Sequence, residues 1–401
     1  MNVFDYEHLA IAAEDFSSFA ENPFDFQYPP RLIFAQDSLD RLGALMLEHG
    51  GRRALLVSDP GVAAAGHASR AAASLEAAGI EVFFFEEIDE NPTTRHVENL
   101  TAFARSNRVD CIVGVGGGSA IDTAKGANFL ISNGGKMEDY LGYGKASEPM
   151  LPMIAVPTTA GTGTETQSFA LIVNEETNQK MACGDKKALC KVVILDPKLT
   201  LSKPARVTAA SGIDAISHVV ESWVSKPRNA ISCMFGAEAW WCLSGAFDSV
   251  ATSPQNIEAR SRMLIGASLA GAAIEHSMLG AAHSCANPLT AQYKTAHGVA
   301  VGLMLPHVVR FNGAECDALY AELLARGGFR LSSGQSAAAF LADWISGRLG
   351  THDLPTRLSE IGVSMAEIPD LALQASKQWT AQFNPRRVTL EDFETLYEAA
   401  F

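Results

Sequence analysis

Four residues in the second half of the chain have the types and spacing of metal ligands: Asp214, His218, His283 and His297. Asp214 and His218 are four residues apart, so on an α-helix their side chains lie on one face and point to a common spot. One carboxylate and three imidazoles suit Zn or Fe(II) better than Mg or Ca, which prefer oxygen ligands. The spacing alone is a weak signal, because a histidine in an apolar stretch more often serves as a hydrogen-bonded core residue. The surrounding sequence must therefore show whether these residues meet.

A glycine-rich stretch in the first half has the composition of an anion-binding turn. Gly114-Val-Gly-Gly-Gly-Ser-Ala-Ile-Asp-Thr-Ala-Lys125 begins within a short apolar run. Its glycines let a phosphate approach the backbone, and the helix that follows offers free N–H groups to an anion. We expect Ser119 to cap this helix, with Asp122 completing a capping box. Ser119 occupies the third glycine position of the usual Gly-x-Gly-x-x-Gly motif, so a tight turn without a ligand is the alternative.

Two further polar segments can contact the rest of a dinucleotide. Thr158-Thr-Ala-Gly-Thr-Gly-Thr-Glu165 follows another apolar run, and its hydroxyl groups and glycines can bond a pyrophosphate or ribose and admit a flat nicotinamide. Asp59, just after the first apolar run, can accept hydrogen bonds from ribose hydroxyls, and its charge opposes a 2′-phosphate. These features predict NAD rather than NADP.

The elements that must position these residues change type halfway along the chain. Short apolar runs ended by turn residues are typical of strands buried in a parallel sheet, and they lie at 54–57, 82–85, 111–115, 153–156 and 192–195. Helical patterns lie between them, as at 62–78 and 95–106, and 167–180 looks like a hairpin laid over the sheet. From about Leu199 apolar residues recur at three- and four-residue steps, which predicts helices at 230–243, 257–278, 337–349 and 390–399.

This change of pattern predicts two domains. We expect an α/β dinucleotide-binding domain with a parallel sheet over residues 1–198 and an all-helical domain over 199–401. Ligands of such a sheet bind at the carboxyl ends of its strands, and a cleft between two domains is a favoured place for a cofactor and a metal to meet.

The composition predicts a globular protein that acts on small molecules. Of the 401 residues, 47% are hydrophobic and 19% are charged, which is enough for two packed cores. The formal net charge of -14 argues against nucleic acid or an anionic membrane as a partner. Seven scattered cysteines suit a reducing compartment. Because the start is not signal-like and no long apolar stretch is present, we expect a cytoplasmic protein, with residues 1–27 packed on the body or on a partner subunit.

Taken together, these stretches resemble the iron-containing alcohol dehydrogenase family. The matching motifs follow one register from about residue 30 to 312 and include 90–93, 116–125, 157–165, 212–221, 280–289 and 296–298. The resemblance implies the dehydroquinate synthase-like fold, with an α/β domain followed by a helical one. It also implies a homodimer or larger homo-oligomer, and NAD(P)-dependent interconversion of alcohols with aldehydes or ketones.

The resemblance further implies roles for individual residues. The four residues of the opening fall on the family's metal ligands, with Fe(II), or alternatively Zn, as the metal. The pyrophosphate loop falls on Gly117, Gly118 and Ser119, and the adenosine-ribose contact on Asp59. We count Asp122 among the cofactor-binding residues as well. The family's other cofactor contacts fall on Asn91, Thr158, Thr159, Thr162 and Lys180.

Two departures from the family bear on the reaction. Where many relatives have a second histidine four residues after the third ligand, this chain has Asn287, which cannot shuttle a proton. His276 lies seven residues before His283, so on one helix the two would share a face, and His276 is our candidate for a catalytic proton relay. The alternative is an ordinary polar residue at a helix edge. Phe169 and Ile274 fall where relatives line the substrate pocket and favour a compact, partly apolar site.

The sequence thus predicts a metal-dependent oxidoreductase that transfers hydride between NAD(H) and a small alcohol or aldehyde, the metal polarising the substrate oxygen. One alternative is a reductase of an anionic aldehyde or keto acid, of the phosphonate, carboxylate or maleylacetate type, on the same fold. A non-catalytic NAD-binding protein is another. The intact set of four ligands argues against the related glycerol-type dehydrogenases and sugar-phosphate cyclases, and against the metal-free reductases.

Overall fold

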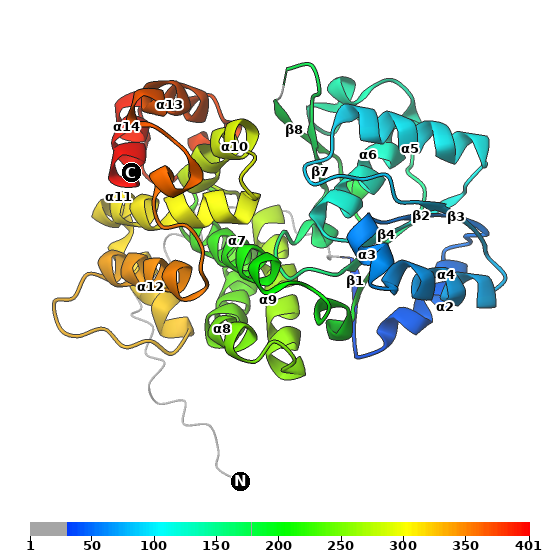
Figure 1. Cartoon of the computed structure of the whole chain (residues 1–401), viewed down its shortest axis with the longest axis horizontal. Helices are drawn as coiled ribbons and strands as arrows, with labels where there is room; N and C mark the ends of the chain where they lie inside the picture. Colours follow the sequence, from blue (N-terminus) through cyan, green and yellow to red (C-terminus); the bar gives the residue numbers. More distant parts are fainter. Residues whose placement is uncertain (1–29, 178) are drawn as a thin grey trace, which may run out of the picture.

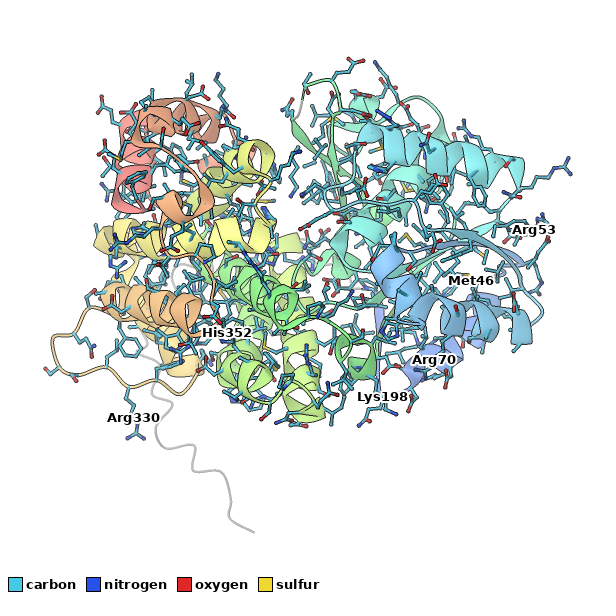
Figure 2. All side chains as sticks on the ribbon, viewed as in Figure 1. Met46, Arg53, Arg70, Lys198, Arg330 and His352 are labelled. Atoms are coloured by element: carbon cyan, nitrogen blue, oxygen red, sulfur yellow. The ribbon has the colours of Figure 1, made fainter. Side chains whose placement is uncertain are left out.

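The computed structural model describes residues 30–177 and 179–401, and these form two halves that lie side by side along the longest axis of the molecule (Figure 1). Arg53 in the first half and Arg330 in the second lie toward opposite ends of this axis (Figure 2). The expected packing of residues 1–27 falls outside the described residues. Within the described ranges, none of the helices has both the length and the apolarity that a membrane crossing requires.

The first half is built on a six-stranded sheet in which every neighbouring pair is parallel. Its order is β1-β9-β6-β4-β2-β3, and the strands are β1 (Arg31–Phe34), β2 (Arg53–Val57), β3 (Glu81–Phe85), β4 (Cys111–Gly116), β6 (Met153–Pro157) and β9 (Val192–Leu195). The predicted parallel sheet is therefore confirmed. The apolar runs did not reveal β1, because it is an edge strand in which only Ile33 is buried.

Helices cover both faces of this sheet (Figure 1). One face packs on α2 (Leu42–Glu48), α3 (Pro60–Ala64) and α4 (His67–Ala77), and the other on α5 (Thr94–Ser106) and α6 (Gly118–Asn133). Alternate residues of a strand point to opposite faces, so Leu56 belongs to the core under α4 and Leu55 to the core under α5. The single helix expected over 62–78 is divided into α3 and α4 at Gly66, whose φ of 82° is left-handed.

The predicted hairpin is present as β7 (Phe169–Val173) and β8 (Lys180–Gly184), which pair antiparallel. The short strand β5 (Gly142–Tyr143) joins β8 on the other side. The hairpin packs against α6 rather than directly on the large sheet. It therefore forms an outer layer at the edge of the first half that faces the helical half (Figure 1).

The second half contains helices only, which confirms the predicted fold class. They are α7 (Ala205–Val224), α8 (Ala230–Thr252), α9 (Ile257–Glu275), α10 (Ala281–Tyr293), α11 (His297–Arg326), α12 (Ala337–Thr351), α13 (Ile368–Ser376) and α14 (Leu390–Ala399). Their apolar residues form one continuous core. The helix expected over 230–243 continues to Thr252, and the one expected over 257–278 ends at Glu275. Helix α7 is buried along most of its length because α8, α9 and α11 all pack on it.

Short 3-10 helices connect these elements. They are η2 (Ser38–Arg41), η3 (Met137–Tyr140), η4 (Thr164–Thr166), η5 (Lys186–Ala188), η6 (Pro197–Thr200), η7 (Leu358–Ile361), η8 (Met365–Glu367) and η9 (Trp379–Phe383). All seven cysteines are buried and free, in keeping with the scattered pattern of the sequence.

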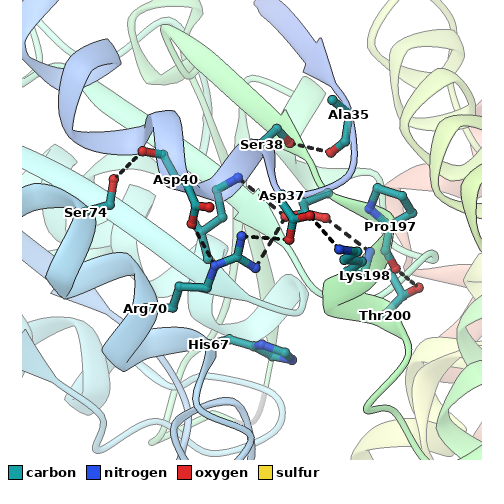
Figure 3. Close-up of polar contacts among 12 residues, drawn as sticks. Ala35, Asp37, Ser38, Asp40, His67, Arg70, Ser74, Pro197, Lys198 and Thr200 are labelled. Carbon is teal, nitrogen blue, oxygen red and sulfur yellow. Dashed lines mark hydrogen bonds and ion pairs between the residues drawn. The ribbon is translucent and has the colours of Figure 1, made fainter.

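A group of ion pairs ties three distant segments together at the carboxyl edge of the sheet (Figure 3). Arg70 of α4 donates to Asp40 at 2.7 Å and to Asp37 at 3.0 Å. Lys198 of η6 pairs with Asp37 at 2.5 Å. The carboxylate of Asp196 is fully buried, and the Arg70 guanidinium lies 3.8 Å from it. Arg70 thus supplies a cation to a buried carboxylate as well as bridging two exposed ones.

We expect Arg70→Met to lower the free energy of unfolding by about 2 kcal/mol, because it removes charged hydrogen bonds and leaves Asp196 buried without this cation. The guanidinium is partly exposed, so solvent screening keeps the loss below that of a fully buried pair. Urea unfolding measures the difference. Arg41→Met, at an exposed arginine of η2 next to Asp40, is the matched control, and an equal loss in both variants would contradict the role of Arg70.

Candidate active site

The two halves enclose a cavity of about 900 Å³. Turns that follow β2, β3, β4 and β6 supply one side of it, and α7, α10 and α11 supply the other. Almost all of the predicted site residues line this cavity: Asp59, Asn91, Gly117, Gly118, Ser119, Asp122, Thr159, Thr162, Lys180, Asp214, His218, His283 and His297. The exceptions are Thr158 and His276.

The four candidate metal ligands lie in one cluster. Ligand atoms of Asp214, His283 and His297 all lie within 4.8 Å of one another. Asp214 Oδ1 is 3.5 Å from His218 Nε2 and 3.7 Å from His283 Nε2. The imidazole centroids of His218 and His283 are 5.1 Å apart, and those of His283 and His297 are 5.4 Å apart. Three of the four residues therefore converge closely, and His218 joins them beside Asp214.

The packing of α7 against α11 explains how distant residues reach this point. Asp214 and His218 occupy one face of α7, as their spacing predicts. His297 is the first residue of α11, and Gly298 follows it. A Cβ at Gly298 would lie 2.0 Å from the carbonyl oxygen of Ala210, so only glycine lets the start of α11 approach α7 this closely. The close approach of α11 to α7 brings the side chain of His297 next to that of Asp214.

Glu221, for which the sequence predicted no role, holds His283 in place. Glu221 Oε2 accepts the Nδ1–H of His283 at 2.5 Å, and Oε1 accepts the N–H of Ala282 at 2.7 Å. A carboxylate on Nδ1 fixes a proton there, so Nε2 is the nitrogen that faces Asp214 and would bind a metal in exchange for its own proton. Glu221 lies seven residues after Asp214 on the same helix, and that spacing could have revealed it.

The charges of the cluster suit a cation. Burial alone would raise the pKa of Asp214, but His218 and the other two imidazoles hold that pKa below its usual range. Burial lowers the pKa of His218 to about 4, and burial together with Lys180 lowers that of His297. Burial also disfavours a charged His283, but Glu221 outweighs it and raises its pKa to about 9. At neutral pH, His218 and His297 thus carry the neutral imidazole that binds metals.

The glycine-rich turn meets the cavity at the start of α6, although not with the expected cap. Gly117 is the N-cap residue and Ser119 lies within the first turn, so the predicted capping box is wrong because the helix begins earlier than the sequence pattern suggested. Asp122 instead accepts a hydrogen bond from the Thr164 hydroxyl at 2.5 Å. A Cβ at Gly118 would lie 2.7 Å from Thr162 Cγ2, so this glycine is needed for the two turns to pack together.

Lys125 is a second residue whose role only the structure reveals. Its side chain is fully buried. Its Nζ donates to the carbonyl oxygens of Thr164 at 2.5 Å, Gln167 at 2.5 Å and Phe169 at 3.1 Å. Thr164 and Gln167 line the cavity, so Lys125 holds a segment of the cavity wall from behind.

The remaining predicted cofactor residues differ in their surroundings. Asp59 caps α3 by accepting from the Val62 N–H at 2.9 Å through Oδ1, which leaves its other oxygen for a ligand. Lys180 begins β8, and burial lowers its pKa. Thr158 is fully buried and lines a small adjoining cavity instead.

His276 does not share a helix with His283. Helix α9 ends at Glu275 and α10 begins at Ala281, because the chain turns between them, so the helical-face argument for a proton relay is wrong. The His276 ring stacks on Phe235 with centroids 6.0 Å apart, and His276 does not line the cavity. Asn287, which stands where many relatives have a second histidine, donates a hydrogen bond to Gln378 Oε1 at 3.0 Å.

Comparisons with known proteins agree with this arrangement. Residues 29–197 match the family model described as iron-containing alcohol dehydrogenase, and residues 208–401 match the model described as the C-terminal part of the Fe-containing alcohol dehydrogenase family. The chain is 32% identical to an NAD-dependent methanol dehydrogenase of Bacillus methanolicus over 94% of this chain and 99% of that protein. It is 33% identical to a 1,3-propanediol dehydrogenase of Klebsiella pneumoniae, with the same coverage.

A solved structure extends the likeness to three dimensions. The crystal structure of a 1,3-propanediol oxidoreductase superposes with a TM-score of 0.90 at 32% identity, covering 94% of this chain and all of that one. Both halves and the turns that frame the cavity therefore have counterparts in known enzymes. The family models, the relatives and the fold agree, and the chain belongs to the iron-containing alcohol dehydrogenase family, a family of alcohol oxidoreductases.

Proposed function

We propose that this chain is a metal-dependent enzyme that transfers hydride between NAD(H) and a small, neutral alcohol or aldehyde. The observation that carries the proposal is the convergence of two sets of residues on one cavity. Asp214 and the three histidines line one part, and the turn at the start of α6 lines another. A family named for iron and alcohol oxidation agrees with both sets.

The cluster fits a divalent metal. In the described part of the chain, Asp214 Oδ1 and His283 Nε2 are buried without a hydrogen-bond partner, although buried polar atoms almost always have one. Together with His218 and His297 they offer the nitrogen and oxygen donors that Fe(II) or Zn prefers. When bound, such a metal acts as a Lewis acid on a substrate oxygen. Glu221 holds the Nδ1 side of His283, so Nε2 is the nitrogen that would bind the metal.

The other part of the cavity fits a dinucleotide. The first N–H groups of α6 are free to bind a pyrophosphate, and Gly117 lacks a side chain that would fill the space beside Thr159. Asp122, Lys180 and the turn held by Lys125 supply polar groups to the same cavity as the four candidate ligands. This arrangement supports the assignment of Asn91, Ser119, Thr159, Thr162 and Lys180 as cofactor contacts.

The cavity wall favours a neutral substrate. Ile274, in the last turn of α9, and Leu279 line the cavity, and neither side chain offers a charge to an anionic group. The basic residues of the lining belong to other segments: Lys180, Lys203, Arg206 and Lys294. Ile274 and Leu279 favour small alcohols and aldehydes over the phosphonate, carboxylate or keto acid substrates of the alternative hypothesis. A non-catalytic NAD-binding protein would need neither a cluster of candidate metal ligands nor an apolar wall beside it.

The test combines metal analysis with assays of turnover. Protein purified without a chelator should contain close to one equivalent of iron or zinc, and it should reduce NAD⁺ with short primary alcohols and oxidise NADH with the matching aldehydes. Turnover confined to anionic carbonyl compounds would favour the reductase alternative. Tight NADH binding without turnover of any compound would favour the non-catalytic one.

Three further predictions go with this function. We infer that the chain acts in the cytoplasm and that it forms a homodimer or a larger homo-oligomer. We also place the boundary between its domains at residues 198 and 199. Sedimentation of the purified protein tests the oligomeric state, and limited proteolysis tests the domain boundary.

We expect Asp59→Gly to raise kcat/KM for NADP relative to NAD about tenfold, because it removes a negative charge that would lie against a 2′-phosphate. Asp59 also caps α3, so Asp59→Asn is the matched variant, since asparagine caps equally well and carries no charge. Steady-state kinetics with both cofactors measures the ratio. An unchanged ratio in both variants would remove Asp59 from the ribose site.

A further inference from the structure

Hydrogen bonds from Asn287 and Ser284 hold a distant segment, residues 378–380, against α10, the helix that carries His283. Asn287 donates to Gln378 Oε1 at 3.0 Å, and the hydroxyl groups of Ser284 and Thr380 lie 2.7 Å apart. On α10, residue 287 is four positions after His283 and therefore shares its face. The segment around Gln378 is thus fixed within about one helical turn of His283.

Trp379 belongs to this segment and contacts the other half of the molecule. The Trp379 ring lies 6.0 Å from that of Phe169 on β7, with an angle of 30° between the planes. The Phe169 ring in turn lies 5.5 Å from that of Tyr143. Trp379 is 37% exposed, so it is not a core residue of the helical half. The aromatic contact therefore joins the second half to the hairpin of the first.

Phe169 belongs to the face of β7 that lines the cavity. Leu171 and Val173 line the cavity, and alternate residues of a strand point to the same face. Phe169, Leu171 and Val173 show the same intermediate exposure, whereas Ala170 and Ile172 between them are buried. Lys125 fixes the backbone here by donating to the Phe169 carbonyl at 3.1 Å. Phe169 is not itself among the residues that line the cavity, and it extends the face of β7 that Leu171 and Val173 present to the cavity.

We propose that Trp379, positioned by Asn287 through Gln378, forms with Phe169 an aromatic wall that limits the size of the substrate. This inference rests on the proposed function and adds a specificity-determining residue to it. The wall lies between the hairpin and α10, the two elements that frame the cavity beside His283. The proposed role of Asn287 is therefore structural and requires no proton transfer, because its amide donates a hydrogen bond to Gln378 and so positions Trp379.

The test compares long and short alcohols in matched variants. Trp379→Ala should raise kcat/KM for 1-hexanol and benzyl alcohol relative to 1-propanol about tenfold, since a few methylene groups in an apolar site change discrimination by at least this factor. Asn287→Ala and Gln378→Ala should shift the ratio in the same direction, and the double variant should exceed neither single one. Trp379→Phe keeps an aromatic ring and should retain the original ratio. Trp241→Ala, at an exposed tryptophan of α8, is the control for a remote position.

The outcomes separate this inference from the proposed function. A wild-type protein that turns over no alcohol in the panel contradicts the proposed function itself. A wild type that is active, with an unchanged long-to-short ratio in Trp379→Ala, overturns only the aromatic wall. An equal shift in Trp241→Ala would also overturn it. Thermal melts of each variant identify any that fail to fold, and Asn287→Ala then tests the wall with Trp379 still present.

Discussion

Asp214→Ala is expected to abolish stoichiometric metal binding and to lower kcat/KM for the alcohol by about 10³-fold or more. Asp214 is the only carboxylate among the four candidate ligands, and its Oδ1 lies between the Nε2 atoms of His218 and His283. Metal ions supply several kcal/mol of transition-state stabilisation, and each 1.4 kcal/mol changes a rate about tenfold. Metal content by mass spectrometry and the rate of NAD⁺ reduction over a range of alcohol concentrations, at saturating NAD⁺, measure the two effects.

The control for this variant is Ser222→Ala on the same helix. Ser222 is also buried, and its hydroxyl bonds only the Val219 carbonyl of its own helix in the described structure. We expect it to keep both metal and activity. If Asp214→Ala retained metal and rate, the assignment of the whole cluster as a metal site would be wrong, because Asp214 supplies the carboxylate of the described cluster, whereas the nearby Glu221 is engaged by His283 Nδ1 and the Ala282 N–H.

Glu221→Gln has the second largest expected effect, a loss of about 10- to 100-fold in metal affinity. Glutamine has the shape of glutamate, but it has only one oxygen for the two N–H groups that Glu221 now accepts, from His283 and Ala282. If that oxygen accepts from Ala282, the amide NH₂ faces His283 Nδ1. The imidazole proton then moves to Nε2, the nitrogen that should bind the metal.

This effect differs from that of Asp214→Ala in a measurable way. Because all four ligands remain in Glu221→Gln, excess metal should restore most of its activity, whereas Asp214→Ala should stay inactive. Metal titration against a chromophoric chelator gives the affinity. Glu238→Gln, at an exposed position of α8, is the control. Equal affinity in Glu221→Gln and the wild type would show that Glu221 only contributes to packing.

Much of the fold could be predicted from the chain because its signals are local. The apolar runs of β2, β4 and β6 lie in the centre of a parallel sheet and are buried on both faces, so every residue in them is selected for burial. The edge strand β1 has one buried residue and left no such pattern. The break between α3 and α4 was missed because Gly66 is the only residue that marks it.

In the candidate site too, the features that could be predicted are local, and the features that were missed depend on packing. The spacing of Asp214 and His218 along α7 is a local property, and the turn at Gly117 and Gly118 follows its strand directly. His276 and His283 were expected to share a helical face, but the chain turns between α9 and α10, and Gly280 is the N-cap of α10. Boundaries of elements depend on tertiary packing as well as on local preference, so a shared helical face that spans such a boundary is not a local property of the sequence.

The sequence by itself determined the class of fold, the candidate metal ligands and the glycine-rich anion-binding turn. Residue type, periodicity and short spacing can be recognised in the sequence without knowing how the elements pack. Tertiary structure alone decided which distant groups touch: Glu221 with His283, Lys125 with the Thr164–Phe169 turn, and Asn287 with Gln378. Each of these is a hydrogen bond between side chains or turns on separate elements. Its existence depends on how closely two elements pack, as Gly298 shows by letting α11 approach Ala210, and no local pattern encodes that distance.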